Sequence, residues 1–202
     1  MAKDYYSLIL KNFHLKDQDI IAAFPFGSKI YKTDNYRSDY DFMVVVNNNT
    51  LKEDRKKIDN INLVLYGENH FLSEVKRHRM SILECLFLPK DLVLKDNKSF
   101  SNVKTNLASL RLYVGEKSID DWNRAEKAFA EENPNFIKSI FHAIRTLDFA
   151  NQIIEYGKIK DYSSCNHIWE HLNNCQFDNW EDYNEIFGQK FDDLYRVIGV
   201  SK

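Results

Sequence analysis

Residues 26–46 decide the fold and read FGSKIYKTDNYRSDYDFMVVV. A Gly-Ser turn ends the apolar run Ile20–Phe26, and a second apolar run occupies Tyr40–Val46. Both runs have the length and composition of buried β-strands. Side chains alternate between the two faces of a strand, so Asp39 and Asp41 point to the same side, about 7 Å apart. The sequence therefore predicts two carboxylates at the start of a strand, beside a Gly-Ser turn.

Each part of this stretch suits a different chemistry. A pair of carboxylates offers the oxygen ligands that hard divalent cations prefer. Gly27 lets the backbone approach a ligand closely, and exposed N–H groups together with the Ser28 hydroxyl bind phosphate oxygens. The pattern predicts one element that holds phosphate next to another that holds a metal ion.

Gly27 to Asp41 resembles the signature of the DNA polymerase beta-like nucleotidyltransferase superfamily, in which Gly-Ser is followed, after a spacer, by Asp-x-Asp. The stretch is most similar to the predicted nucleotidyltransferases of the RNA repair pathway type in bacteria and phages, with the motif G-S-R-A-Y-G-x-x-T-P-x-S-D-Y-D. Lys29 replaces the usual arginine of that motif, and Lys32 replaces the usual glycine. The motif residues that agree beyond the glycine are Ser28, Tyr31, Ser38, Asp39, Tyr40 and Asp41.

Two later segments extend the resemblance. Glu68–Pro89 is similar to the family's helix followed by N-P-x-x-L-E-x-L-F-x-P, and Phe136–Gly157 to its helix H-x-x-R-x-L followed by glycine. The resemblance implies an α+β fold: a small mixed β-sheet nucleotidyltransferase core with flanking helices in residues 1–100. A helical C-terminal half, residues 101–202, would close the nucleotide cleft.

The resemblance also implies an activity and a site. A nucleoside monophosphate would move from an NTP, expected to be ATP, to an acceptor hydroxyl by a two-metal mechanism with Mg²⁺ or Mn²⁺. Asp39 and Asp41 would bind the metal. The residues expected to contact the nucleotide are Gly27, Ser28, Lys29, Tyr31, Ser38, His142 and Arg145.

The third catalytic position is unusual. Family members carry an acidic residue on the adjacent strand, and aligning the predicted strand Ile61–Tyr66 places Asn62 there. A neutral amide oxygen weakens a second metal site because ligand charge is lost. Asp59 would fill the position if the strand register shifted, whereas Glu68 and Glu84 are poorer substitutes.

Asn62 leaves several functions open. The chain is either an active transferase with a weakened second metal site or a catalytically degenerate protein that binds a nucleotide or a partner. That partner-binding role could be regulatory or antitoxin-like, modifying or masking another protein. The acceptor is equally open between RNA, a protein and a small molecule, because one fold serves many acceptors. Base preference and oligomeric state are not determined by the sequence.

Composition excludes several other classes. With 28 Lys and Arg against 30 Asp and Glu, the chain has no net positive field of the kind that drives non-specific nucleic-acid binding. At 202 residues and 44% hydrophobic content it is able to form a real core. Three cysteines give no disulfide framework. No leader and no long apolar run is recognised, so we predict a cytoplasmic protein without a membrane partner.

Hydrophobic spacing predicts the remaining elements. In the first half it indicates helices near Tyr6–Phe13 and at Phe71–His78, and a strand or buried segment at Ile82–Phe87. In the second half, one helix would end at Gly115, and Ser118 with Asp121 would open another as a capping box. Later helices are expected from Asn133-Pro134 to Gly157, near Asn166–Asn173 and over Trp180–Val197.

The helix ending at Gly157 has a second stripe beside its apolar face. The stripe is either a nucleotide-contacting face, as the resemblance implies for His142 and Arg145, or an ordinary solvated face. Its members are Lys138, His142, Arg145, Phe149 and Gln152.

A zinc site in the last third is the weaker interpretation of its cysteines and histidines. Cys165, His167, His171 and Cys175 have suitable side chains, but they follow one predicted helix, and a continuous helix cannot wrap four ligands around one ion. The tryptophans are expected to anchor the core rather than to stack on bases; they are Trp122, Trp169 and Trp180.

Overall fold

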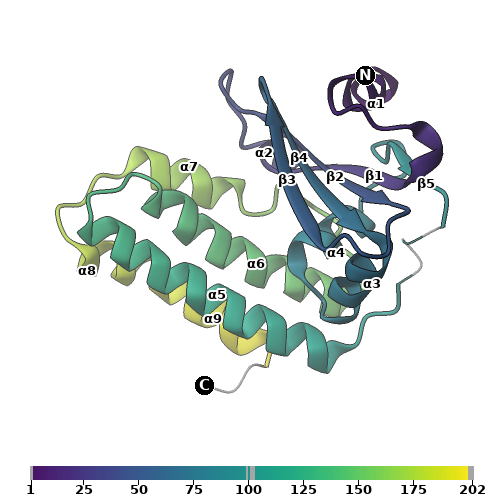
Figure 1. Cartoon of the computed structure of the whole chain (residues 1–202). Helices are drawn as coiled ribbons and strands as arrows, with labels where there is room; N and C mark the ends of the chain where they lie inside the picture. The colour runs from purple at the N-terminus through teal and green to yellow at the C-terminus, as the bar shows by residue number, and fades with distance from the viewer. Residues whose placement is uncertain (1, 99, 101–102, 200–202) are drawn as a thin grey trace. The chain divides into compact units, whose positions relative to one another are not determined.

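The apolar runs on either side of the Gly27 turn are neighbouring strands in a computed structural model, which describes residues 2–98, 100 and 103–199. The chain divides into two units, Met1–Lys104 and Thr105–Lys202. Figure 1 shows that the strands belong to the first unit and that the second is helical among the residues described.

The first unit is built on a five-stranded mixed sheet with the order β3-β4-β2-β1-β5. β2 and β4 are parallel, and the other neighbours are antiparallel. The mixed sheet agrees with the fold class predicted from the sequence. The strands are β1 (Ile20–Phe26), β2 (Tyr40–Val46), β3 (Glu53–Ile58), β4 (Ile61–Gly67) and β5 (Lys95–Asp96).

Helices cover both faces of this sheet, which explains why β1, β2 and β4 are apolar on both sides. On one face, Ile9 and Phe13 pack into a core with side chains such as Val44 and Leu63. On the other face, α3 and α4 contact the sheet. The helical elements of the unit are α1 (Ala2–Asn12), a 3₁₀ turn at Asp17–Asp19, α2 (Ser28–Tyr31), α3 (Glu68–Lys76) and α4 (Met80–Leu86).

Two elements of this unit differ from the sequence-based expectation. β3 was not predicted, because residues 53–58 read EDRKKI and lack apolar alternation. The segment at Ile82–Phe87, predicted as a strand or buried segment, is buried but helical. A short apolar run that is buried on all sides has no periodicity to distinguish helix from strand.

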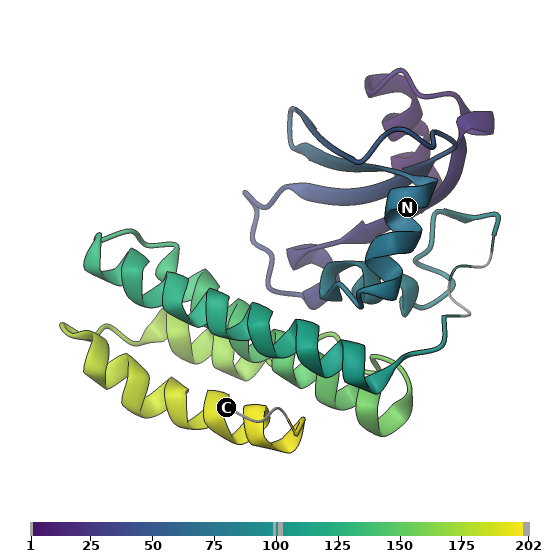
Figure 2. The same cartoon turned by 60° about the horizontal axis from the view of Figure 1, so that its bottom comes forward.

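The second unit is a bundle of helices. Its two longest helices, α5 and α6, form an antiparallel pair (Figure 1), and α7 and α9 pack against α6; Figure 2 shows the bundle with the yellow α9 in front. The elements are α5 (Leu107–Ala130), α6 (Phe136–Tyr156), α7 (Asn166–Asn174), α8 (Trp180–Tyr183), a π-helical turn (Asn184–Gly188) and α9 (Gln189–Val197).

The break predicted at Gly115 is wrong, since α5 continues through it as a single helix. Gly115 is buried, and the Ser118 hydroxyl donates to its carbonyl at 3.2 Å instead of opening a new helix. The N-terminal cap of α5 is Asn106, whose side chain accepts from the Ser109 amide. The C-terminal cap predicted at Gly157 is confirmed, with φ of 72°.

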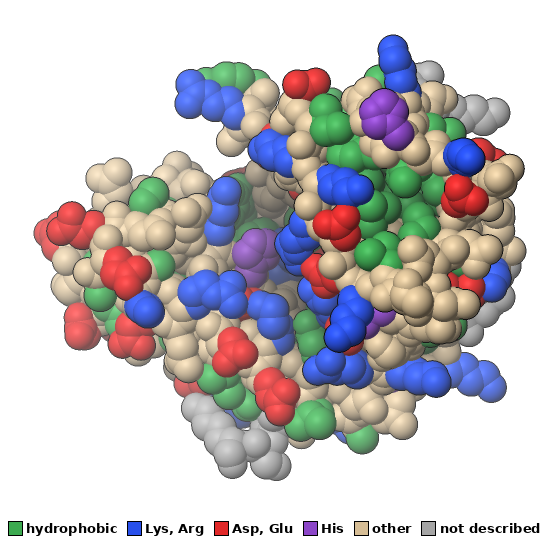
Figure 3. All heavy atoms as spheres, viewed as in Figure 1, with side chains coloured by type: hydrophobic (Ala, Val, Ile, Leu, Met, Phe, Trp, Pro, Cys, Tyr) green, Lys and Arg blue, Asp and Glu red, His purple; other side chains and the backbone are tan. Residues whose placement is uncertain are grey.

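Both signs of charge occur on the face that Figure 3 presents, where many of the Lys and Arg side chains lie toward its centre. The composition is nearly balanced, with 28 Lys and Arg against 30 Asp and Glu. Among the described residues, no helix is both long and apolar enough to cross a membrane.

Candidate nucleotide and metal site

The register of the sheet brings Asp39, Asp41 and Asn62 together. β2 and β4 run parallel with Asp41 opposite Asn62, which is the alignment expected from the sequence. Asn62 Nδ2 donates to Asp41 Oδ1 at 2.8 Å and to Asp39 Oδ2 at 3.2 Å. A single amide therefore holds the two carboxylates in a fixed relation.

The other acidic candidates lie elsewhere in the first unit. Asp59 is exposed in the turn between β3 and β4, with φ of 52°. Glu68 opens α3, where its carboxylate pairs with Lys98, and Glu84 is buried on α4. In the observed register, Asn62 occupies the position next to Asp41.

Lys57 is a member of this cluster that the sequence did not predict. β3 and β4 are antiparallel with Lys57 opposite Asn62, and Lys57 Nζ lies 2.6 Å from Asp39 Oδ2. The two-residue turn Asp59-Asn60, with Asp59 at positive φ, is the sequence signal for this hairpin. The hairpin was not predicted because the strand before the turn is highly charged and lacks the alternating apolar residues of a typical strand.

Lys57 also sets the electrostatics of the pair. Its hydrogen bond lowers the pKa of Asp39, desolvation opposes this shift, and the hydrogen bond from Asn62 adds to it. Asp39 is therefore ionised at neutral pH, as a cation ligand has to be.

Gly27 brings the end of β1 against Asp41. Phe26 pairs with Asp41 across the antiparallel strands, and Gly27 follows with φ of 82°. A Cβ atom at Gly27 would lie 2.3 Å from Asp41 Oδ2, which is closer than any side chain tolerates. Only glycine permits both this backbone conformation and this approach. Ser28 follows directly and begins α2.

Lys29 and Ser38 stabilise the loop between the two strands. Lys29 Nζ lies 3.2 Å from Asp34 Oδ2 and 4.2 Å from the centre of the Tyr40 ring. The Ser38 hydroxyl accepts from the Asn35 amide at 2.9 Å, in the turn that leads to Asp39. Both residues thus stabilise the loop that leads to Asp39 and β2.

Tyr31 points into the core, which differs from the nucleotide contact expected for it. Its side chain is buried, and the phenol donates to the carboxylate of Glu84. The reason is that α2 packs against the sheet, so the ring lies inside the unit and connects α2 to α4.

The stripe predicted along α6 is not a single surface. Arg145 is only 5% exposed, and its guanidinium lies 5.4 and 5.6 Å from the ring centres of Phe141 and Phe149. Gln152 is buried and donates to Asp148 Oδ2 at 2.8 Å. Lys138 and His142 are exposed. The solvated-face interpretation is therefore wrong for Arg145, Phe149 and Gln152, because α7 and α9 pack on α6.

Positive charge gathers around His142. Desolvation, followed by the positive charges of Arg145, Lys117, Lys138 and Arg124, lowers the pKa of His142 well below its usual value. The residue is nevertheless exposed, so a neutral imidazole with cationic neighbours is accessible on this unit. Such a cluster suits an anionic ligand.

A buried carboxylate on α5 organises part of this cluster. Asp121 is 2% exposed, and one of its oxygens lies 3.0 Å from Arg124 Nη1. The other oxygen accepts from the ammonium group of Lys117, one helical turn away. The carboxylate thus fixes two cations on the surface of the helix.

No zinc-like set of ligands is found in the described part of the chain, where no three His, Cys, Asp or Glu side chains converge. Cys165 and Cys175 lie at opposite ends of α7. The tryptophans pack against other aromatic rings: Trp122 on Trp180 and Phe191, and Trp169 on Phe141.

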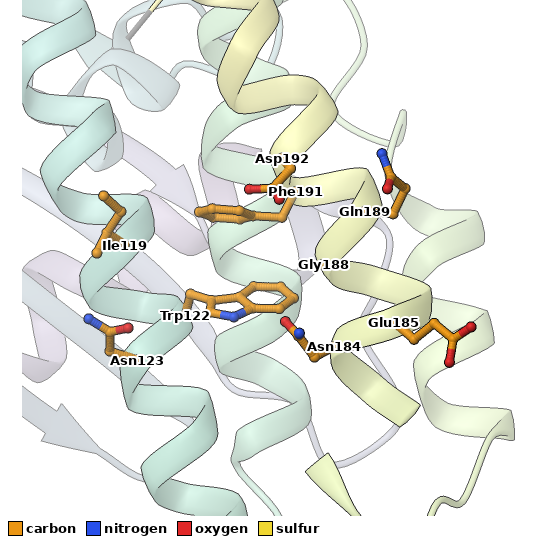
Figure 4. A pocket seen from close by; sticks show the side chains of 9 residues that line it. All are labelled: Ile119, Trp122, Asn123, Asn184, Glu185, Gly188, Gln189, Phe191 and Asp192. Carbon is orange, nitrogen blue, oxygen red and sulfur yellow. The ribbon is translucent and has the colours of Figure 1, made fainter. Parts of the chain in front are cut away.

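A pocket of about 540 Å³ lies in the second unit. Figure 4 shows that Trp122 and Phe191 extend from facing helices at its centre, whereas Glu185 and Gln189 point outward. It contains none of the site residues predicted from the sequence. Its lining residues are Ile119, Trp122, Asn123, Asn184, Glu185, Gly188, Gln189, Phe191 and Asp192.

The donor set of the first unit fits one divalent cation better than two. Asp39, directly before β2, and Asp41, within it, supply carboxylate oxygens, and phosphate and water oxygens are the usual further ligands of Mg²⁺. A second cation would have to rely on Asn62, whose nitrogen is turned toward both carboxylates.

Solved structures of other proteins resemble this chain distantly. No family model and no curated protein matches the sequence. A nucleotidyltransferase-like protein from Exiguobacterium sibiricum has a TM-score of 0.38 at 9% identity, over 97% of this chain and 75% of that one. Spectinomycin adenyltransferase AAD(9) from Enterococcus faecialis, solved with ATP and spectinomycin, has a TM-score of 0.49 at 15% identity, over 98% of each chain. With both TM-scores below 0.5, any assignment of chemistry depends on the site geometry.

Proposed function

We propose that the chain is a nucleotidyltransferase that moves a nucleoside monophosphate from an NTP, most simply ATP, to an acceptor hydroxyl. The observation that carries the proposal is the contact between Gly27 and Asp41. This contact puts a carboxylate pair suited to a divalent cation against a Gly-Ser turn suited to phosphate.

The reaction follows from these roles. The acceptor oxygen forms a bond to the α-phosphorus, the bond from that phosphorus to the pyrophosphate oxygen breaks, and the acceptor proton passes to water. A divalent cation, when bound, neutralises phosphate charge and polarises the phosphoryl group. Asp39 and Asp41 would hold it, Gly27 and Ser28 would bind phosphate oxygens, and Lys29 and Ser38 would keep the loop in place.

On the second unit, taken by itself, the cationic surface around His142 is a candidate for binding a nucleotide. A neutral imidazole donates and accepts hydrogen bonds, which suits a base or ribose, and the neighbouring cations suit a triphosphate. Arg145, buried next to Phe141 and Phe149, would add its positive charge to this cluster. These groups suit a nucleoside triphosphate of any base and do not select the acceptor, which is RNA, a protein or a small molecule.

The direct test is incubation of the pure protein with each α-³²P-labelled NTP and Mg²⁺ or Mn²⁺, with RNA, protein extract, small alcohols or no acceptor added. We expect label to move to one acceptor class, and Asp41→Asn to abolish the transfer while the melting temperature is retained. Asp54→Asn is a matched control, because Asp54 lies on β3 with a carboxylate oxygen 3.5 Å from Lys56 Nζ rather than beside Asp41. Full transfer by Asp41→Asn would refute the metal assignment.

A second candidate function is nucleotide binding without transfer, which Asn62 favours because the expected third carboxylate is missing. Equilibrium binding of ATP in the presence of Mn²⁺ separates the two candidates. Tight binding that depends on Asp41, with no labelled product under any condition, would assign the chain to this class.

A further inference from the structure

The side of the carboxylate pair that faces β4 and β3 is already occupied by the chain itself. Lys57 Nζ and Asn62 Nδ2 both bind Asp39 Oδ2, at 2.6 and 3.2 Å. A carboxylate oxygen accepts about two hydrogen bonds, so this atom is saturated. The opposite side of the pair is different, because Asp41 Oδ2 faces Gly27.

The register of the sheet places Lys57 within reach of Asp39. Lys57 is paired with Asn62, and Asn62 with Asp41, so the three residues form one row across β3, β4 and β2. Paired residues on one face of a sheet have Cβ atoms about 5 Å apart. A lysine in the outer strand of this row is long enough to reach across Asn62 to Asp39.

Lys57 also reduces the net negative charge of the side chains that would surround a metal ion. Asp39, Asp41 and Lys57 together carry a single net negative charge, whereas three carboxylates would carry three. Cation affinity rises with the charge of the ligands. A second divalent cation on the β4 side would have to displace the ammonium group and then bind to a neutral amide.

We propose that Lys57 supplies, as part of the chain, the positive charge that a second divalent cation would otherwise supply, so that the site operates with one divalent cation bound together with the nucleotide. This inference rests on the proposed nucleotidyl transfer. The ammonium group of Lys57 would stabilise negative charge on the attacking oxygen and the α-phosphate, and Asn62 would keep Asp39 and Asp41 oriented.

The first test counts metal ions. Free Mn²⁺ is measured by electron paramagnetic resonance while the protein is titrated in the presence of the α,β-methylene analogue of ATP. We expect one Mn²⁺ per chain for the wild type and for Lys56→Met. The double variant Lys57→Met with Asn62→Asp should bind two, because it regains a third carboxylate and loses the competing ammonium group.

The second test measures turnover with water as the acceptor, as AMP and pyrophosphate released from ATP. Lys57→Met should lower the rate about 100-fold, the size of effect seen when one preorganised stabilising group is removed. Lys57→Arg should retain a rate within about tenfold of wild type because the charge is kept. Lys56→Met should match the wild type, and melting curves check that every variant is folded.

Two results would overturn the inference: two Mn²⁺ per wild-type chain, or a Lys57→Met rate equal to or above the wild-type rate. The latter would mean that the lysine blocks the carboxylates rather than assisting them. A different result would refute the proposed nucleotidyl transfer itself: neither the wild type nor Asp41→Asn would bind Mn²⁺ in the presence of the nucleotide analogue. The proposal for Lys57 depends on that function and would then be refuted with it.

Discussion

At the scale of single residues, Gly27 carries the tightest constraint in the site. Its positive φ and its approach to Asp41 Oδ2 are both needed to bring the phosphate-binding turn to the carboxylates. A side chain here would meet Asp41 Oδ2, the second oxygen of a carboxylate whose Oδ1 accepts from Asn62. Backbone conformation and metal coordination are thus coupled at one position.

Gly27→Ala should therefore lose Mn²⁺-dependent ATP binding and cost about 1–3 kcal/mol of stability, because the new methyl group forces both backbone strain and movement of Asp41. Isothermal titration and urea unfolding measure the two effects. Gly157→Ala is the control, since Gly157 also has positive φ but a Cβ there meets no atom within 4 Å. Retained ATP affinity in Gly27→Ala would show that Asp41 does not need this approach.

Arg145 offers a second test at this scale. Arg145→Met keeps a long side chain between Phe141 and Phe149 but removes a positive charge from the cluster around His142, so we expect the KM for ATP to rise about tenfold. The melting temperature should change less than for Arg145→Ala, which also leaves a cavity. An unchanged KM in both variants would make Arg145 a purely structural residue.

At the scale of elements, β3 is attached to the rest of its unit by a polar network. Glu53 accepts hydrogen bonds from Arg79, Tyr66 and Arg55, at 2.9, 2.9 and 2.8 Å. Desolvation opposes ionisation of Glu53, but these hydrogen bonds outweigh it and lower the pKa of Glu53. The network joins β3 to β4 and to Arg79, which directly precedes α4.

Glu53→Gln should lower the free energy of unfolding by about 1–3 kcal/mol at pH 7, the range for hydrogen bonds to a charged group. Because the folded-state pKa is lowered, this stabilisation is complete above the unfolded pKa of about 4.3 and disappears as pH falls through the folded value. The difference from wild type should therefore shrink below about pH 4. Urea unfolding at pH 7 and pH 3.5 measures the difference, with the half-exposed Asp54→Asn as a control expected to change little. A difference independent of pH would assign the effect to packing.

The elements also show what the sequence was able to predict. β1, β2 and β4 were predicted because buried apolar runs end at recognisable turns, and their register then gave the proximity of Asp39, Asp41 and Asn62. β3 was missed because five of its six residues are charged. Lys57 was missed with it, since its role depends on a cross-strand pairing. The helix end predicted at Gly115 was wrong because the packing of α5 against α6 outweighs the cost of about 1 kcal/mol for a glycine inside a helix.

At the scale of the whole molecule, each unit has its own buried core, and Trp122, Trp169 and Trp180 all lie in the second unit. Tryptophan fluorescence thus reports on one unit, whereas far-ultraviolet circular dichroism reports on both. Leu63→Ala leaves a cavity in the core of the first unit and should lower the free energy of unfolding of that unit by about 2–5 kcal/mol. We expect part of the dichroism transition to move to lower urea while the fluorescence midpoint stays in place. Equal shifts in both signals would show that the units unfold as one.

The outer position of β3 has a consequence for solubility. A strand at the margin of a sheet exposes unpaired amides and carbonyls that a second chain is able to pair with, and proteins counter such edge-to-edge aggregation with charged side chains. Glu53, Asp54, Arg55, Lys56 and Lys57 place a charge at five successive positions of this strand. The opposite edge strand, β5, has only two residues, so it offers few unpaired backbone groups to a second chain. Lys57 would therefore serve two purposes, one in the chemistry of the site and one in keeping copies of the chain apart.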